Sequence, residues 1–404
     1  MAPAAVSPSP GHMRFIPFTY DPADSHASAL KLIHAIAPHW ANDDHVEFVR
    51  FTDGITNTLL KAVNRRPGLS PAEIDREAIL LRAYGNGTDI LIDREREAAN
   101  HELLMKYNLA PALLARFANG MLYRFIPGSV AQPKDLPDRI LSKAIARRLA
   151  QWHATVPCLP DIRNPATSIE LTGNSNKAKI ANVAPGKPTP NLWSTIQKWI
   201  LALPVDTDAE RERQSKLQKE LQLLVQQLSQ RPGFGQNGLV FAHCDLLSAN
   251  VIMHNDDNKP FSVSFIDYEY GTPSPAAFDI ANHFAEWAGY DCDYAAIPKR
   301  SQRLAFVREY IETYAQLSGA GEDFKIERET VKMMRDVDDF RGVPGFYWGI
   351  WSSIQATISK IDFDYASYAE LRLGEYWACK YEQDGSRRAS GKAMPLREMA
   401  WASE

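Results

Sequence analysis

Residues 241–270 read FAHCDLLSANVIMHNDDNKPFSVSFIDYEY. Two short apolar runs rich in β-branched residues, 251–253 and 263–266, lie on either side of the polar turn NDDNKP. This pattern is typical of a β-hairpin. Because a hairpin brings its two flanks together, we expect Asp245 and Asn250, which precede the first run, to lie near Asp267, which follows the second.

The residue types at these three positions suit phosphoryl transfer. An Asp followed five residues later by an Asn has the spacing of the catalytic loop in protein-kinase-like phosphotransferases. Hard oxygen ligands hold Mg²⁺ on nucleotide phosphates, while a separate carboxylate accepts the proton of the attacking hydroxyl. His243 is expected to pack the loop and is not proposed as a base. The alternative interpretation, in which the acidic residues are solvated turn residues, leaves their order along the hairpin to chance.

Composition indicates a globular enzyme. The chain has 404 residues, 45% of them hydrophobic, and a net charge of -4, so it can bury a large core in one or two domains. No basic cluster with interleaved aromatic residues predicts nucleic-acid binding, and no window of ~18 apolar residues predicts a membrane span. The opening MAPAAVSPSP lacks the pattern of a signal peptide. Four scattered cysteines predict reduced thiols and a cytoplasmic location.

The first third of the chain has the pattern of a strand-rich region. Apolar runs alternate with polar turns from residue 46 onward. Gly54 lies in the turn 52–56, where the lack of a side chain would let the backbone approach a phosphate. Strands are predicted at 46–51, 57–63, 78–85, 112–117 and 120–126, with helices at 29–36 and 94–107.

Arg82 is predicted to lie in the middle of an apolar strand. A buried cation is costly unless it is paired, and Glu97 on the following helix is a candidate partner. In kinases a strand cation held by a helix Glu grips the nucleotide phosphates. The alternative is an edge strand with the Arg82 head group in water.

The remainder is predicted to be mainly helical, with a surface excursion at 156–191 that is rich in Pro, Asn and Lys. The fold class is therefore α+β. We expect a disordered tail at 1–20, a nucleotide-binding lobe at 21–126, a catalytic and substrate-binding lobe at 127–382 and a flexible tail at 383–404. Helices are predicted at 134–154, 208–230, 275–287, 299–317, 326–340 and 345–361.

Aromatic residues in the last third suggest a site for a cation. Trp348 and Trp351 are three residues apart, so they share one face of a helix. Ring faces together with carboxylates attract ammonium groups. The alternative is that the tryptophan pair is ordinary core. Further candidates around this pair are Glu286, Tyr290, Phe363, Tyr365 and Tyr368.

At this point the sequence resembles a known family, the choline/ethanolamine kinases, over residues 46–381. The stretches HCDLLSANVI, FIDYEYGTPSPAAFDIANHFAEW and YWGIWSSIQATISKIDFDYASY are similar to its signature segments. The stretch LLRAYGNGTDILIDREREAANHELLMKYNLAP is more similar in sequence to ethanolamine kinases than to choline kinases. The resemblance implies a bilobal protein-kinase-like fold, with a small strand-rich N-lobe and a large helical C-lobe. It also implies ATP-dependent phosphorylation of ethanolamine to phosphoethanolamine, the first step of the CDP-ethanolamine route to phosphatidylethanolamine.

The resemblance also implies residue roles. Asp245 corresponds to the catalytic base, and Asn250 with Asp267 to the ligands of Mg²⁺. Arg82 and Glu97 correspond to the pair that grips the phosphates of ATP. The adenine-side hinge corresponds to residues 124–128, with Arg124, Phe125 and Ile126 as candidates for contact with ATP. The positions around the amine correspond to Glu286, Trp348, Trp351, Phe363 and Tyr368, and Asp245 and Tyr290 are further candidates for contact with the substrate.

One departure bears on the choice of substrate. Asp291 stands where choline-type members carry an aromatic residue, with Tyr290 adjacent. An additional carboxylate favours ethanolamine, whose ammonium has three N–H donors, over choline, which has none. The partners implied are ATP and a small amino alcohol, and a homodimer is left open.

Three alternatives remain. The chain could phosphorylate choline, or both amines. A relative among aminoglycoside or protein kinases is a second alternative, but Asp-Phe-Gly and Ala-Pro-Glu are missing from the sequence, and the turn at 52–56, where a kinase would carry its glycine-rich loop, does not read GxGxxG. A non-catalytic kinase-like scaffold is the third, and such a protein would normally have lost Asp245, Asn250 or Asp267.

Overall fold

The computed structural model describes residues 13–40, 45–51, 57–85, 90–158, 175–255, 260–359 and 361–404. The chain divides into two compact units, Met1–Thr88 with Ala110–Pro127 and Asp89–Leu109 with Gly128–Glu404. This division differs from the predicted boundary at 126/127 in the placement of helix α3 (Arg94–Lys106), which belongs to the second unit. The reason is local: Asn100 of α3 donates to the carbonyl of Gly271 at 2.9 Å.

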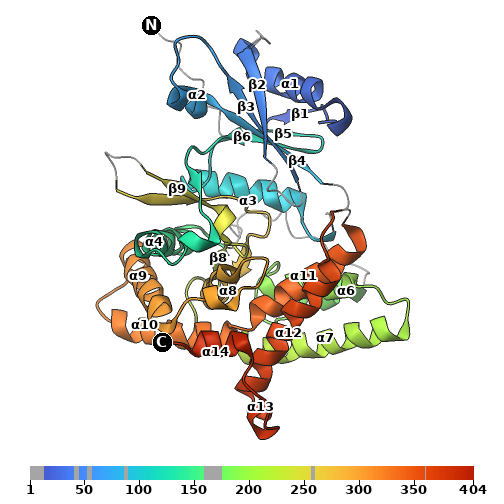
Figure 1. The fold of residues 1–404 in the computed structure, drawn as a ribbon, viewed down its shortest axis with the longest axis vertical. Helices are drawn as coiled ribbons and strands as arrows, with labels where there is room; N and C mark the ends of the chain where they lie inside the picture. The colour runs from blue at the N-terminus through green and yellow to red at the C-terminus, as the bar shows by residue number, and fades with distance from the viewer. Residues whose placement is uncertain are drawn as a thin grey trace. The chain divides into compact units, whose positions relative to one another are not determined.

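The first unit is built on a six-stranded sheet with the order β1-β5-β6-β4-β3-β2. Its pairs are antiparallel except β1 with β5. Helix α1 (Ser25–Ile36) buries Ala29, Leu32 and Ile33 in the core that it shares with the sheet (Figure 1). Helix α2 (Pro71–Glu77) starts with a capping box between Ser70 and Glu73. The strands are β1 (Phe15–Ile16), β2 (Val46–Phe51), β3 (Asn57–Asn64), β4 (Ile79–Tyr84), β5 (Leu113–Phe117) and β6 (Gly120–Arg124).

The predicted disordered tail at 1–20 is wrong for the part that the structure describes. β1 adds to the sheet beside β5, and Tyr20 is 1% exposed. The backbone N–H of Tyr20 donates to the Asn119 side chain at 2.9 Å. These residues are ordered because their apolar side chains close one edge of the core. Residues 1–12 and the predicted phosphate turn 52–56, with Gly54, lie outside the described residues.

Short strands of the second unit form the frame of the hairpin. β9 (Val251–His254) and β10 (Ser262–Phe265) are antiparallel, with Val251 opposite Phe265, so the predicted hairpin is confirmed. β7 (Ser129–Val130) pairs with the other edge of β9. A pairing that the sequence did not predict joins β8 (Val240–Ala242) to β11 (Thr272–Ser274). This pairing holds together the segments that precede and follow the hairpin.

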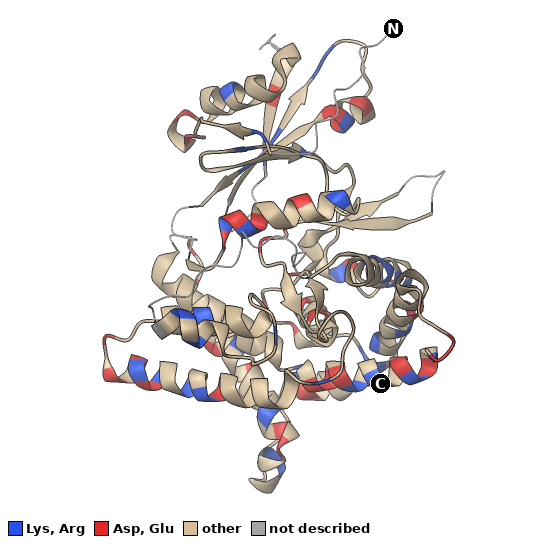
Figure 2. Cartoon of the chain, turned by 180° about the vertical axis from the view of Figure 1, so that it is seen from behind, with Lys and Arg blue, Asp and Glu red and all other residues tan. Residues whose placement is uncertain are grey.

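Helices make up most of the second unit (Figure 1). Helix α8 (Ala276–Ala285) is buried along its whole length, and it contacts α10 and α11. Outer helices carry charges of both signs, as α7 shows in Figure 2. The other helices are α4 (Arg139–Thr155), α5 (Ser175–Ala181), α6 (Leu192–Ala202), α7 (Asp208–Leu228), α9 (Arg300–Ser318), α10 (Ile326–Phe340), α11 (Val343–Ile358), α12 (Tyr365–Gln383), α13 (Ser386–Ala389) and α14 (Leu396–Ala402).

The predicted flexible tail at 383–404 is also wrong. It forms α13 and α14, and Trp401 of α14 is 5% exposed. The Trp401 indole donates to the Asp338 carboxylate at 2.8 Å. Its polar composition misled the prediction because Arg397 and Glu398 are buried in ion pairs rather than solvated. Among the described helices, none is long and apolar enough to cross a membrane.

Candidate active site

Asp245 and Asn250 lie in the loop between β8 and β9, and the hairpin of β9 and β10 brings Asp267 back to them. The Asn250 side-chain amide donates to the Asp245 carbonyl at 2.7 Å and to its Oδ2 at 3.3 Å. The backbone N–H of Ile266 donates to the Asn250 carbonyl at 3.0 Å. Asp267 follows directly, and its charge raises the pKa of Asp245 after the larger effect of burial. The expected convergence at one end of the hairpin is therefore observed.

Helix α8 fixes the backbone of this loop through Asp279. Its Oδ2 accepts the N–H of His243 at 2.9 Å, and its Oδ1 accepts the N–H of Cys244 at 2.8 Å. Cys244 has φ +63°, a conformation that a non-glycine residue rarely adopts. Two backbone donors held by one buried carboxylate stabilise this conformation. The turn that presents Asp245 is consequently set by a residue 34 positions later in the sequence.

Two further residues of α8 hold the same loop. Asn282 donates to the carbonyl of Cys244 at 3.0 Å, and a ring nitrogen of His283 bonds to the carbonyl of Leu246 at 2.8 Å. The Trp287 indole donates to the other ring nitrogen of His283 at 3.2 Å. Burial lowers the pKa of His283 to about 4, so this ring is neutral at physiological pH.

Asp279 itself is stabilised as an anion. Burial acts to raise its pKa, but the hydrogen bond and charge of His153, with Nε2 3.0 Å from Oδ2, lower it overall. The other ring nitrogen of His153 bonds to the Tyr310 hydroxyl at 2.8 Å. His243 is fully buried, and its ring lies 5.3 Å from that of Trp152, as expected for a packing residue. Sequence reasoning missed Asp279, His153 and Tyr310 because their link spans three helices.

The candidate base has a negative environment. Burial and three carboxylates raise the pKa of Asp245 well above its usual range. Asp267 has φ +65°, again in the left-handed region. Buried carboxylates that repel one another are stabilised by a cation. The neighbouring carboxylates are, in order of effect, Asp267, Glu286 and Glu269.

The donor set at this place fits a magnesium ion. Asn250 uses its amide nitrogen on Asp245, so its oxygen is the atom that would act as a ligand, and Asp267 would supply a carboxylate. Mg²⁺ is usually held by one or two carboxylates together with substrate phosphates rather than by a complete protein cage. Among the described residues there is no group of three or more His, Cys, Asp or Glu that could hold a metal ion.

The aromatic residues form a continuous row of ring contacts. The centroid distances are 5.6 Å for Tyr270–Trp348, 5.5 Å for Trp348–Trp351 and 5.9 Å for Trp351–Tyr365. Both tryptophans are 7% exposed. Their indole N–H groups are engaged, with Asn282 at 2.9 Å and Tyr270 at 2.8 Å. The pair is thus well packed, and it also ties the ring row to α8.

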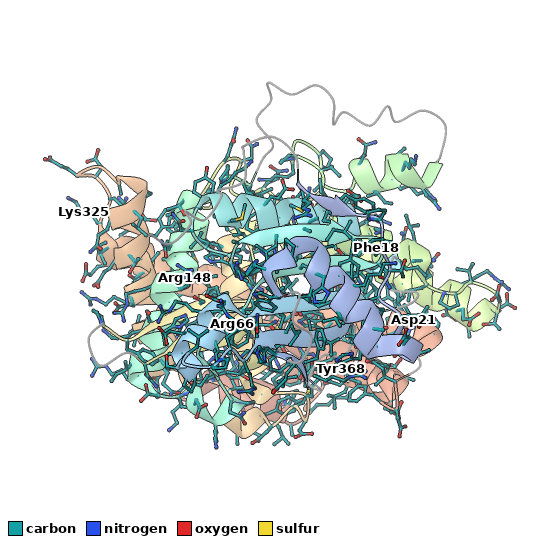
Figure 3. The ribbon with its side chains drawn as sticks, turned by 90° about the horizontal axis from the view of Figure 1, so that it is seen from above. Phe18, Asp21, Arg66, Arg148, Lys325 and Tyr368 are labelled. Atoms are coloured by element: carbon teal, nitrogen blue, oxygen red, sulfur yellow. The ribbon has the colours of Figure 1, made fainter. Side chains whose placement is uncertain are left out.

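The row continues to an exposed rim. Phe363 lies 4.8 Å from Tyr365 and 5.5 Å from Tyr368, which is labelled on α12 in Figure 3. Tyr290 lies 6.4 Å from Phe363 and 6.3 Å from Tyr368. Tyr290 is 48% exposed and Phe363 40%. Tyr290 therefore belongs to the same group of contacting rings, whereas the neighbouring Asp291 is exposed. We call this group the ring cluster; its members are Tyr270, Tyr290, Trp348, Trp351, Phe363, Tyr365 and Tyr368.

Glu286 has a partner that the sequence analysis missed. Arg372 is 1% exposed and donates from Nη2 to Glu286 Oε1 at 3.1 Å. Its Nη1 lies 3.4 Å from the Tyr368 hydroxyl. Arg372 and Tyr368 are four residues apart on α12, the spacing at which helical side chains meet. This spacing in the sequence could have indicated that Arg372 lies beside Tyr368.

The predicted nucleotide residues of the first unit are well ordered. Arg82 is 4% exposed on β4, an interior strand between β6 and β3, so the edge-strand alternative is wrong. Arg124 donates to the Glu77 carbonyl at 2.6 Å. The ring of Phe125 stacks on that of Phe51, with 6.4 Å between the ring centroids. The next residue, Ile126, is half-buried.

Glu97 belongs to the second unit. It is 3% exposed and pairs with Arg94 at 2.9 Å. Arg94 also lies 3.4 Å from Glu269. The roles of Arg82 and Glu97 as a phosphate-gripping pair stay a prediction.

Comparison with known proteins identifies the family. The model of the choline/ethanolamine kinase family matches residues 48–377. The chain belongs to this family. The match includes every candidate residue described above, from Arg82 to Tyr368.

Several curated members of the choline/ethanolamine kinase family are similar over most of their length. A probable ethanolamine kinase of Nematostella vectensis is 34% identical over 370 residues, which cover 89% of this chain and 95% of the relative. Ethanolamine kinase 1 of Homo sapiens is 32% identical over 361 residues, which cover 88% of this chain and 72% of the relative.

Solved structures agree with the fold. An ethanolamine kinase of Plasmodium vivax has a TM-score of 0.64 and 25% identity, covering 89% of this chain and 98% of that one. A choline kinase of Cryptosporidium parvum has a TM-score of 0.60 and 22% identity, covering 89% and 96%. The protein-kinase-like fold expected from the sequence is confirmed.

Proposed function

We propose that this chain is an ethanolamine kinase, which transfers the γ-phosphoryl group of ATP to the hydroxyl of ethanolamine. The observation that carries the proposal is the position of Asp245. This carboxylate has a raised pKa and lies within the electrostatic reach of Glu286, which borders the ring cluster through Arg372 and Tyr368. The proposed proton acceptor and the residues proposed to bind the ammonium group all belong to the second unit. The relatives named ethanolamine kinases support the choice of substrate.

The proposed reaction needs one proton acceptor and one phosphate acceptor. The ethanolamine hydroxyl gives its proton to Asp245 while its oxygen forms a bond to the γ-phosphorus, and the bond from that phosphorus to the oxygen of ADP breaks. The Asn250 amide, 3.3 Å from Asp245 Oδ2, orients the carboxylate. We propose Asn250 and Asp267 as the residues that would hold Mg²⁺, which supplies charge neutralisation of the phosphates when bound.

Recognition of the amine would use rings and one carboxylate. Ring faces attract the ammonium through their quadrupole, and Glu286 supplies an acceptor. Its Oε1 is taken by Arg372, so Oε2 is the oxygen we assign to the substrate. Besides Asp245 and Glu286, the proposed contacts are Tyr290, Trp348, Trp351, Phe363 and Tyr368.

The nucleotide would be bound through the remaining candidates. We propose Arg82 and Glu97 as the pair that orients the phosphates of ATP, and 124–126 as the segment on the adenine side. The product, phosphoethanolamine, places the enzyme at the start of the CDP-ethanolamine route. A location in the cytoplasm and a homodimer also stay predictions. Four free cysteines support the reducing compartment.

A second candidate function is the phosphorylation of choline. One observation favours it: Tyr290 lies against Phe363 and Tyr368. Tyr290 can therefore supply the aromatic wall for which choline-type members use the residue at the position of Asp291. A trimethylammonium group depends on such walls because it has no N–H donors. The exposed Asp291 therefore discriminates less between the two amines than the sequence suggested.

The test is a substrate panel with ethanolamine, its N-methylated derivatives and choline at saturating MgATP. We expect kcat/KM for ethanolamine to exceed that for choline roughly tenfold, because an acceptor left without its N–H partner costs about 1 to 3 kcal/mol. Tyr290→Leu should reduce the use of choline more than that of ethanolamine. Equal or better use of choline by the unmodified chain would contradict the choice of ethanolamine, and no phosphorylation of either amine would contradict the kinase.

A further inference from the structure

A line of buried charges runs from the proposed amine site to the C-terminal helix. Arg372 lies between Glu286, at 3.1 Å, and Glu375, at 3.3 Å. Glu375 lies 3.9 Å from Arg397 of α14. All four of these residues are buried. Their signs alternate, so every charge is compensated by its neighbours.

The outer end of the line is anchored on the rest of the second unit. Arg397 contacts Glu398 at 3.3 Å and donates to the Arg341 carbonyl at 2.7 Å. Glu398 in turn pairs with Arg341 at 2.9 Å. Helix α14 is thereby held by buried ion pairs as well as by Trp401. Figure 1 shows α14 beside α12, the helix that carries Arg372 and Glu375.

The inner end of the line controls two candidate substrate contacts at once. One guanidinium reaches Glu286 through Nη2, Tyr368 through Nη1 and Glu375 through Nε. Glu286 and Glu375 therefore compete for Arg372. Arg397 neutralises part of the charge of Glu375, which limits how strongly Glu375 attracts Arg372. A change at Arg397 should then be felt at Glu286, because charges in a buried network are weakly screened.

We infer that Arg372 and Arg397 are positioning residues for the amine site, and that α14 sets the affinity for the amine through them. The inference rests on the proposed function, since it takes Glu286 and Tyr368 as contacts of the substrate. Neither arginine touches the phosphoryl group in this assignment. Loss of the line should leave Glu286 and Tyr368 without the guanidinium that orients them, which raises KM for the amine, and should leave kcat nearly unchanged.

The test compares Arg397→Met with Arg388→Met, a matched change at an exposed arginine of α13. We expect Arg397→Met to raise KM for ethanolamine about fivefold or more, a coupling typical of residues in one ionic network. KM for ATP and kcat should stay within about twofold, and Arg388→Met should change none of them. Arg397→Lys, which keeps the charge, should give a smaller rise and serves if the methionine variant does not fold.

A double variant separates positioning from general damage. Glu375→Gln removes the charge that Arg397→Met leaves uncompensated, so the pair together should return KM for ethanolamine toward the value of the unmodified chain. A merely structural loss of α14 would lower the folded fraction, seen by thermal unfolding, and would not be repaired by Glu375→Gln. Unchanged amine KM in folded Arg397→Met and Arg397→Lys overturns the inference. If the unmodified chain phosphorylates no amine in the same assay, the proposed function fails instead.

Discussion

At the residue scale, Asp245 is a carboxylate whose ionised form is costly to the fold. It is 8% exposed, and burial and neighbouring negative charges raise its pKa. A carboxylate in this state is a stronger proton acceptor than one in water, as is common in active sites. The same feature destabilises the folded protein at neutral pH, because the folded pKa lies above that of the unfolded chain.

Replacement of Asp245 by Asn should therefore have opposite effects on activity and stability. Turnover should fall about 10² to 10⁴-fold, because the proton acceptor is lost. The free energy of unfolding should rise in the absence of metal and nucleotide, because a buried charge among like charges is removed. Steady-state kinetics and urea denaturation measure the two quantities, with Asp323→Asn at an exposed site as the control. More than a tenth of the original turnover would exclude Asp245 as the base.

At the element scale, α8 acts as the support for the catalytic loop. Its carboxylate Asp279, amide Asn282 and imidazole His283 bond to consecutive parts of residues 243–246. The helix can do this because all its residues are buried and its polar side chains find partners in the loop. A helix fully packed on all sides is a rigid base for a loop with an unfavourable backbone conformation.

Asp279→Asn is expected to weaken this support. An amide offers one acceptor where the carboxylate offers two, so one of the backbone N–H groups of His243 and Cys244 loses its partner. The free energy of unfolding should fall by about 1 to 3 kcal/mol, opposite in sign to the effect of Asp245→Asn. Because the loop carries the base but none of the rings or Glu286, which are the proposed partners of the ammonium group, kcat should fall at least tenfold while KM for ethanolamine changes little. A drop in stability with unaltered kcat would contradict a supporting role.

At the scale of the whole molecule, stability should depend on pH through buried imidazoles. His283 is neutral in the fold, since its pKa falls from 6.5 to about 4, mainly through burial. Below pH 6.5 His283 binds a proton in the unfolded chain, whereas in the folded chain it binds one only near pH 4. The free energy of unfolding is therefore unaffected by His283 above pH 6.5 and decreases as the pH falls from 6.5 toward 4. Burial also lowers the pKa of His243, which adds to the effect in the same direction.

The magnitude can be bounded for His283. A shift of this size corresponds to a loss of about 3 kcal/mol at most. His283→Gln keeps a donor for the Leu246 carbonyl and an acceptor for Trp287 but cannot titrate. We expect its free energy of unfolding, measured from pH 7.5 to 4.5, to decline less steeply than that of the unmodified chain. Parallel curves would show that His283 does not contribute.

The sequence by itself determined the central hairpin, several strands of the first unit and the chemistry of the loop. The strands at 46–51 and 251–254 and the hairpin that joins Asn250 to Asp267 follow from alternation of apolar residues and from turn residues, which act over a few positions. Convergence of Asp245, Asn250 and Asp267 could be predicted because one hairpin connects them. Local patterns are sufficient where the contacts themselves are local.

The tertiary structure decided which partner each buried polar group has. Glu286 meets Arg372, 86 residues away, and the loop at 243–244 meets Asp279, 35 to 36 residues away. It also ordered the polar C-terminal segment and placed Tyr290 in the ring cluster. No local pattern contains this information, because a buried charge is satisfied by whichever opposite group the packing of distant helices brings within reach.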